Sequence, residues 1–315
     1  MNINLAGIQI GHATNEVAHT GCTVFLCPEQ TVGSVDVRGP APGSRETALL
    51  QPDKPIHYVN GVVLTGGSAF GLATADGVMQ YLAEREIGHW TAIRPIPIVP
   101  AAVVYDLFFN QGQNPPDAAM GYQACENARP SAILQGNVGA GAGVTVGKWG
   151  GFEGPMKGGF GLACEEVEGV VVGAAAVVNA VGDVVNTDGS VLAGARKKEG
   201  GWLVEDNPYR LFPARPPAQI SNTTLVVVWT NAILSKVEVH RLAQRAHDGL
   251  AIAIRPVHTT HDGDTAFALA TGRVEGNFDL VANTAVEMVA EAIRNSVRYA
   301  ETVSPILGLG LKTEH

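Results

Sequence analysis

The sequence predicts a layered α/β sandwich. Two runs rich in Val and Ala, at 169–179 and 225–230, lack the alternation of apolar and polar residues that marks a half-exposed strand. Such runs are typical of strands buried on both faces. Segments with apolar residues at helical spacing flank these runs, and helices can cover both faces of a sheet. The order of elements is mixed rather than a strict βαβ alternation, which favours a sandwich.

The remaining elements follow from local signals. A short apolar strand is expected at 61–65, and Ser68, which follows two glycines, is the expected N-cap of the first helix. Helices are expected where apolar residues recur at helical spacing or Ala is abundant, at 68–86, 117–128, 235–254 and 284–303.

Composition and charge exclude several classes of protein. Gly supplies 38 of the 315 residues, about 12% against a typical usage of roughly 7%, but without the three-residue period of collagen. Hydrophobic residues make up 46% of the chain, enough for a large core. The net charge of −9 disfavours nucleic acid as a partner. No apolar run reaches about 18 residues, so no membrane partner is expected.

Cysteines, histidines and the start of the chain favour a cytoplasmic protein without a cofactor. No secretory signal is recognisable, and none of the four cysteines belongs to a CxxC pair, so we expect reduced thiols. The cysteines are Cys22, Cys27, Cys125 and Cys164. His258 and His261 are three residues apart but have no third ligand, so we expect no metal.

The junction between Asn222 and Thr223 allows two interpretations. Residues 196–201 are charged and 207–217 are rich in Pro and Arg, so an exposed segment where cleavage can occur precedes the buried strand. The junction is either a plain turn before a strand or a cleavage site. After cleavage the free amine of Thr223, with a reference pKa of about 7.7–8.0, could act as base for its own hydroxyl.

Two further segments carry candidate chemistry. Asp262 and Asp264 form either a solvated turn or, if buried near Thr223, a site for a positively charged group, since residues i and i+2 of an extended stretch point to one side. The glycine-rich run 136–147 lacks the spacing of a phosphate loop, but its backbone N–H groups could serve an oxyanion. Lys148 at its end is either a surface lysine or a buried ammonium that orients a hydroxyl.

Taken in order, these segments resemble the L-aminopeptidase/D-esterase (DmpA-like) peptidases, a family that includes β-aminopeptidases and nylon-oligomer (6-aminohexanoate) hydrolases. Each segment is weak alone, but their shared order over nearly the whole chain is specific. The matching segments are 11–12, 36–39, 42–43, 64–72, 75–77, 139–148, 157–159, 178–183, 222–224, 255–258 and 262–264.

The resemblance implies a four-layer αββα sandwich of the DmpA and ornithine-acetyltransferase type, in a single hydrolase domain over residues 1–315. It also implies self-cleavage into an α chain, 1–222, and a β chain, 223–315. The mature protein would be an N-terminal-threonine hydrolase acting on small peptides, amino-acid amides or ω-amino oligomers. The resemblance further implies a homo-oligomer, a tetramer.

The resemblance also assigns roles to residues at matching positions. Thr223 would be the nucleophile, Lys148 would lie beside its hydroxyl, and Asn179 would donate to the oxyanion. Asp262 and Asp264 would position the Thr amine or a substrate amine. Some members have Ser as the nucleophile and Ser-x-Glu in place of the two aspartates, so this chain is similar to the Thr/Asp-x-Asp branch.

Tyr105 looks like the family's pocket tyrosine.

Three other functions remain open. An acyltransferase like the ornithine acetyltransferases would pass the acyl group to an amine instead of water. An unprocessed binding protein would use the same scaffold without catalysis. A glycosidase-like pair is remote, because Asp262 and Asp264 are too close in sequence to span a sugar.

Overall fold

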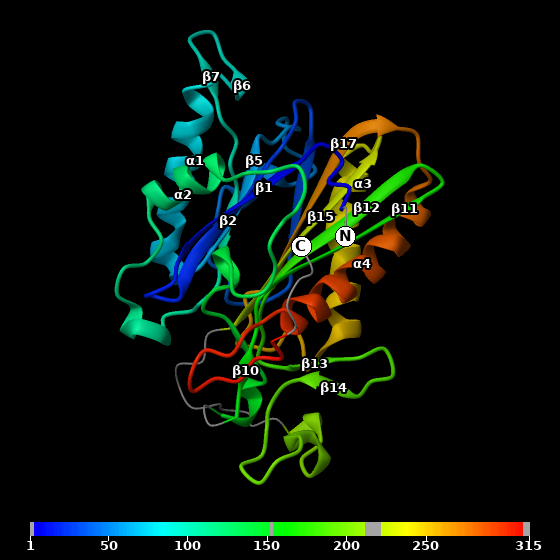
Figure 1. Ribbon diagram of the computed structural model, residues 1–315. Helices are drawn as coiled ribbons and strands as arrows, with labels where there is room; N and C mark the ends of the chain where they lie inside the picture. Colours follow the sequence, from blue (N-terminus) through cyan, green and yellow to red (C-terminus); the bar gives the residue numbers. More distant parts are fainter. Residues whose placement is uncertain (1–2, 152–153, 212–221, 311–315) are drawn as a thin grey trace.

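Two five-stranded sheets form the centre of the computed structural model (Figure 1). The structure describes residues 3–151, 154–211 and 222–310. The first sheet has the order β1 (Gln9–Asn15), β2 (Thr20–Leu26), β5 (Gly61–Thr65), β8 (Ala101–Val103) and β4 (Ser44–Arg45). The second has the order β11 (Phe160–Val167), β12 (Val170–Asn179), β15 (Thr223–Ala232), β17 (Thr265–Val274) and β3 (Val32–Val37).

Within the described residues, four α-helices cover the sheets, and none of them is long and apolar enough to cross a membrane. They are α1 (Thr74–Ala83), α2 (Ala118–Glu126), α3 (Lys236–Ala253) and α4 (Phe278–Arg298). The smaller strands are β6 (His89–Trp90), β7 (Pro95–Ile96), β9 (Thr145–Val146), β10 (Met156–Lys157), β13 (Asp183–Val185), β14 (Val191–Ala193) and β16 (Ile254–Arg255).

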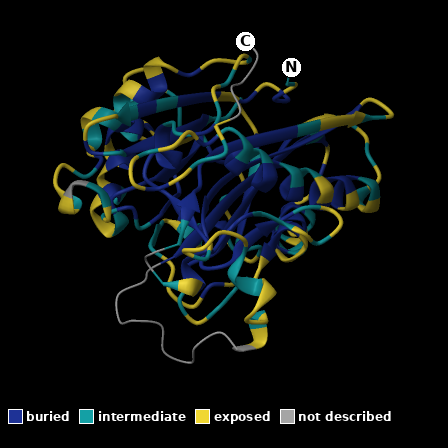
Figure 2. Cartoon of the chain, turned by 60° about the horizontal axis from the view of Figure 1, so that its bottom comes forward, coloured by how far each residue is buried: buried dark blue, intermediate teal, exposed yellow. Residues whose placement is uncertain are grey.

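The apolar cores show how these elements pack. One core lies between the two sheets and joins Phe25 and Leu64 of the first to Val227 and Phe267 of the second. A second core lies between the first sheet and helices α1 and α2, and a third lies between the second sheet and helices α3 and α4. Figure 2 shows the consequence, since the central strands are buried while loops and outer helix faces are exposed. The mixed α/β class predicted from the apolar runs is therefore confirmed.

The predicted elements are present with some different bounds. Strands β5, β12 and β15 coincide with the three apolar runs. The first helix does not begin with Ser68 as an N-cap, because Ser68 has a left-handed φ of 53° and a 3-10 helix, Ser68–Ala73, precedes α1. Helix α4 begins before residue 284, where Asn277 caps it by accepting a hydrogen bond from Leu280 N–H.

The expected exposed segment is only partly described. Residues 196–201 are mostly exposed, in agreement with their charge. A 3-10 turn at Tyr209–Leu211 lies within the Pro- and Arg-rich stretch 207–217, of which 212–217 lie outside the described residues. Asn222, the residue directly before β15, is again described, and it is buried.

The packing of strand β15 in the sheet depends on a close contact with its neighbour β12. Trp229 of β15 is fully buried, and a Cβ added to Gly173 of β12 would lie 2.3 Å from two atoms of its indole ring. Only a residue without a side chain therefore leaves room for this indole between the sheets.

We expect Gly173→Ala to destabilise the protein by about 1–3 kcal/mol, because the new methyl group would overpack the core against Trp229. The measurement is the free energy of unfolding in denaturant. A matched control is Gly61→Ala in β5, where the nearest atom to an added Cβ is Phe25 O at 3.1 Å. A Gly173→Ala protein as stable as the control would contradict this account of the packing.

Candidate functional site

The ends of two buried strands bring Asn179 and Thr223 together. Strand β12 ends at Asn179 and strand β15 begins at Thr223, and the antiparallel register of the two strands pairs these residues directly. Both are buried, with 1% and 6% of their surface exposed. The Val- and Ala-rich runs that predicted the strands thus place a hydroxyl and an amide at one sheet end.

Hydrogen bonds fix the backbone of Asn222, whose carbonyl group belongs to the peptide bond before Thr223. Thr223 Oγ1 donates a hydrogen bond to Asn222 O at 2.5 Å, and Gly263 N–H donates to the same oxygen at 2.8 Å. Asn222 N–H donates to His261 O at 3.2 Å, and Asn222 forms a parallel bridge with Asp262. The hydroxyl of Thr223 therefore lies against the carbonyl group that self-cleavage would attack.

Lys148 is buried at this site rather than on the surface. It follows Gly147, whose φ of 76° turns the chain, and only 6% of the lysine is exposed. Its Nζ donates to Asn179 O at 3.0 Å and to Asn179 Oδ1 at 2.7 Å. Burial lowers the pKa of Lys148 to about 7, against the attraction of Asp262 and with a smaller lowering by Lys157.

The hydrogen bonds of Asn179 fix the direction of its amide. Its Oδ1 accepts from Lys148 and, at 3.1 Å, from Thr145 N–H, so its Nδ2 faces the other way and donates to Tyr105 O at 2.9 Å. One of the two Nδ2 hydrogens is used in that bond. Tyr105 thus joins the site through its backbone oxygen.

Both predicted carboxylates are buried near Thr223, so they do not form a solvated turn. Asp262 and Asp264 are 2% and 1% exposed. Burial, followed by the negative charge of Asp264, raises the pKa of Asp262 to about 6, while Lys148 opposes this rise. The glycine between them is required by space, because a Cβ on Gly263 would lie 2.8 Å from Thr223 Oγ1.

The two carboxylates have different partners. Asp262 Oδ2 accepts from Thr259 N–H at 2.7 Å and from Thr259 Oγ1 at 2.6 Å. Asp264 Oδ1 accepts from Thr224 N–H at 2.7 Å, and its Oδ2 lies 2.7 Å from His258 Nδ1. Asp264 is therefore tied to the first peptide group of β15, and Asp262 to the preceding turn.

Sequence reasoning missed His258 and the backbone N–H of Gly263. The sequence suggested His258 only as a metal ligand with His261 and as the end of the family segment 255–258, whereas the structure bonds it to Asp264 six residues away. No pattern in the sequence marks this spacing. The described residues contain no group of three or more His, Cys, Asp or Glu that could hold a metal ion.

Two backbone N–H groups at the centre of the glycine-rich run are not open to an oxyanion. Gly139 N–H donates to Thr14 Oγ1 at 2.8 Å, and Ala140 N–H donates to Thr23 Oγ1 at 3.2 Å. These donors are used inside the protein because the run is packed against strands β1 and β2. Its contribution to the site is to carry Lys148.

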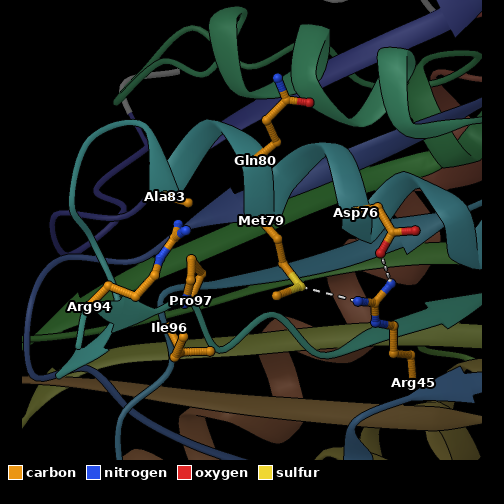
Figure 3. A pocket seen from close by; sticks show the side chains of 8 residues that line it. All are labelled: Arg45, Asp76, Met79, Gln80, Ala83, Arg94, Ile96 and Pro97. Atoms are coloured by element: carbon orange, nitrogen blue, oxygen red, sulfur yellow. Dashed lines mark hydrogen bonds and ion pairs between the residues drawn. The ribbon is translucent and has the colours of Figure 1, made fainter. Parts of the chain in front are cut away.

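A surface hollow of about 450 Å³ lies elsewhere, beside helix α1 and strand β7 (Figure 3). On one side Arg45 donates to Asp76 at 2.6 Å and contacts Met79 Sδ at 3.1 Å. The lining residues are Arg45, Asp76, Met79, Gln80, Ala83, Arg94, Ile96 and Pro97. None of the predicted site residues is among them.

Comparison with known proteins agrees with the fold and with amide-bond hydrolysis. The chain is 41% identical over 300 residues to an uncharacterized aminopeptidase of Mycobacterium leprae, covering 86% of this chain and 78% of the relative. It is 32% identical over 281 residues to a 6-aminohexanoate-oligomer endohydrolase of Paenarthrobacter ureafaciens, covering 87% and 76%.

Solved structures show the same fold at lower identity. A β-aminopeptidase of Burkholderia sp. matches with a TM-score of 0.72 at 22% identity, covering 97% of this chain and 89% of the other. The L-aminopeptidase D-Ala-esterase/amidase of Ochrobactrum anthropi, described as a variant of the Ntn hydrolase fold, matches with a TM-score of 0.70 at 20% identity, covering 93% and 84%. The sequence model of peptidase family S58 matches residues 3–308, so this chain belongs to peptidase family S58.

Proposed function

We propose that this peptidase is an N-terminal-threonine amide hydrolase that first cleaves its own chain between Asn222 and Thr223. The observation that carries the proposal is the 2.5 Å contact between Thr223 Oγ1 and Asn222 O in a buried site. The packing of two sheets between two pairs of helices supports the four-layer αββα arrangement of an N-terminal-nucleophile hydrolase.

Self-cleavage begins with attack of Thr223 Oγ1 on the carbonyl carbon of Asn222. Negative charge then develops on Asn222 O, where the N–H of Gly263 at 2.8 Å stabilises it. The C–N bond breaks, the nitrogen of Thr223 takes a proton, and an ester joins the Asn222 carbonyl to Oγ1. Water hydrolyses that ester, which leaves a carboxylate on Asn222 and a free amine on Thr223.

The first attack requires a base other than the amine, since the nitrogen of Thr223 is still in a peptide bond. Lys148 suits this role because its pKa of about 7 leaves a large neutral fraction near neutral pH. Its Nζ is bonded to Asn179, the register partner of Thr223. We therefore assign the hydroxyl proton to Lys148 in this step.

In the mature enzyme the new amine of Thr223 can take over as base for Oγ1. Oγ1 attacks the carbonyl of a substrate amide, the amine product leaves with the proton, and water hydrolyses the acyl-enzyme. We propose that the remaining N–H of Asn179 Nδ2 faces the substrate oxyanion and that Asp262 and Asp264 hold an ammonium group.

The substrate class follows from this charge arrangement. Two buried carboxylates against one lysine leave an excess of negative charge, which favours a substrate with a free amine. Small peptides, amino-acid amides and ω-amino oligomers meet this requirement. A screen of aminoacyl amides and 6-aminohexanoate oligomers with the purified protein, each beside its N-acetylated form, tests this, and equal hydrolysis of the free and N-acetylated forms would contradict it.

We expect wild-type protein to separate on a denaturing gel into fragments of about 23 and 10 kDa, the second beginning Thr-Thr-Leu-Val. Thr223→Ala should remain one chain of 32.9 kDa, because it lacks the attacking oxygen. Thr223→Ser should still cleave, since it keeps the hydroxyl. Thr230→Ala, another buried threonine of β15, is the control and should cleave normally. If the Thr223→Ala protein were still cut after residue 222, the proposal would be wrong.

We expect the self-cleavage rate of freshly refolded protein to rise about tenfold per pH unit below pH 7 and to level off above it. The reason is the sign of the Lys148 titration, because the lysine is protonated below its pKa of about 7 and able to accept a proton above it. Lys148→Met and Lys148→Arg should both be slow and lack this rise, whereas Lys54→Met at an exposed position should keep it. An unchanged profile in Lys148→Met would assign the base elsewhere.

A further inference from the structure

His258 lies directly behind one of the two site carboxylates. Its Nδ1 is 2.7 Å from Asp264 Oδ2, and its backbone N–H donates to the same oxygen at 3.3 Å. A carboxylate oxygen only accepts hydrogen bonds, so with Asp264 ionised the hydrogen between them belongs to Nδ1. The backbone of His258 is left-handed, with a φ of 52°, which turns both donors toward Asp264.

The ring of His258 packs against the ring of His247, a residue of helix α3. The two ring centroids are 4.9 Å apart at an angle of 67°, and His247 is 1% exposed. Burial, followed by the charge of His258, lowers the pKa of His247 to about 4, so at neutral pH this ring is uncharged. Its Nε2 lies 3.2 Å from Asp36 O of strand β3. Packing between helix and strand thus fixes the ring of His247 against one side of the His258 imidazole.

Asp264 connects His258 to the residue next to the proposed nucleophile. While Oδ2 contacts His258, Oδ1 accepts from Thr224 N–H at 2.7 Å. The peptide group that carries this N–H is the one that joins Thr223 to Thr224. A rotation of the Asp264 carboxylate would therefore break its hold on the residue that carries the attacking oxygen.

We infer that His258 is a positioning residue, which sets the orientation of Asp264 and, through it, of the Thr223–Thr224 peptide. This inference rests on the proposed function of Thr223. It assigns His258 no contact with the substrate and no proton transfer. Its contribution is a hydrogen bond to a carboxylate that is 1% exposed, and a hydrogen bond to a buried carboxylate is stronger than one in solution.

Two substitutions separate the hydrogen bond from the backbone. Asn and Gly both tolerate a left-handed φ, but only Asn offers a side-chain N–H near the place of Nδ1. We expect His258→Gly to slow self-cleavage by about tenfold or more, the usual loss for a hydrogen bond to a charged group, and His258→Asn to stay within about threefold of wild type. His240→Asn is the control, since His240 contacts Ser34 Oγ instead and should cleave normally.

A double-mutant cycle with Asp264→Asn tests whether His258 acts through Asp264. If it does, adding His258→Gly to Asp264→Asn should change the cleavage rate by less than about twofold. Equal losses in His258→Gly and His258→Asn, or an undiminished loss in the Asp264→Asn background, would show a purely structural role and overturn the inference. Thermal unfolding of each variant confirms that it is folded.

The outcome for wild type keeps this test distinct from that of the proposed function. Wild-type protein that cleaves supports the function whatever the His258 variants do. If wild type stays whole, the self-cleavage proposal fails. The same variants are then compared by kcat and KM for an aminoacyl amide. There a fall in kcat in His258→Gly that His258→Asn reverses supports the positioning role, and its absence overturns it.

Discussion

The candidate site depends on the antiparallel pairing of β12 and β15, which sets Asn179 opposite Thr223. Lys148 reaches the site by bonding to Asn179, and the parallel pairing of β15 with β17 brings Asp264 to Thr224. A slip of one residue in this register would turn every side chain of β15 to the other face. Because both faces of these strands are apolar, the specific obstacle to such a slip is the fit of Trp229 against its register partner Gly173, which links the sheet core to the site.

Burial also shapes the electrostatics of the site. Only 16% of the residues in the chain are charged, yet Lys148 and Asp262 are both buried here. Burial moves the two pKa values toward each other, down to about 7 and up to about 6. The contribution of Asp262 to the free energy of unfolding falls as pH rises from 3.8 to about 6, because only the folded state keeps the Asp262 proton in this range. The contribution of Lys148 rises as pH rises from about 7 to 10.5, because only the unfolded state keeps the Lys148 proton there.

Sequence reasoning was reliable where one residue type repeats and weak where a single backbone angle decides. The valine runs predicted β12 and β15 because burial on both faces leaves a compositional trace. The i, i+2 spacing of Asp262 and Asp264 predicted two carboxylates on one side of the chain, and the structure buries both but gives them different partners. The approach of His258 could not be foreseen, because it depends on a left-handed residue and on helix α3 packing behind it. Tyr105 contributes a backbone oxygen to Asn179, which no side-chain pattern reports.

The order of strands in the second sheet has a consequence for how the molecule can be assembled. Strands β15 and β17 follow residue 222, yet they lie between β12 and β3, which precede it. If the bond between 222 and 223 is cut as proposed, the two pieces would remain interleaved in one sheet and could separate only by unfolding. Folding before the cut is a first-order event, independent of concentration. Reassembly after the cut is second-order, so dilution would make the loss of structure irreversible in practice.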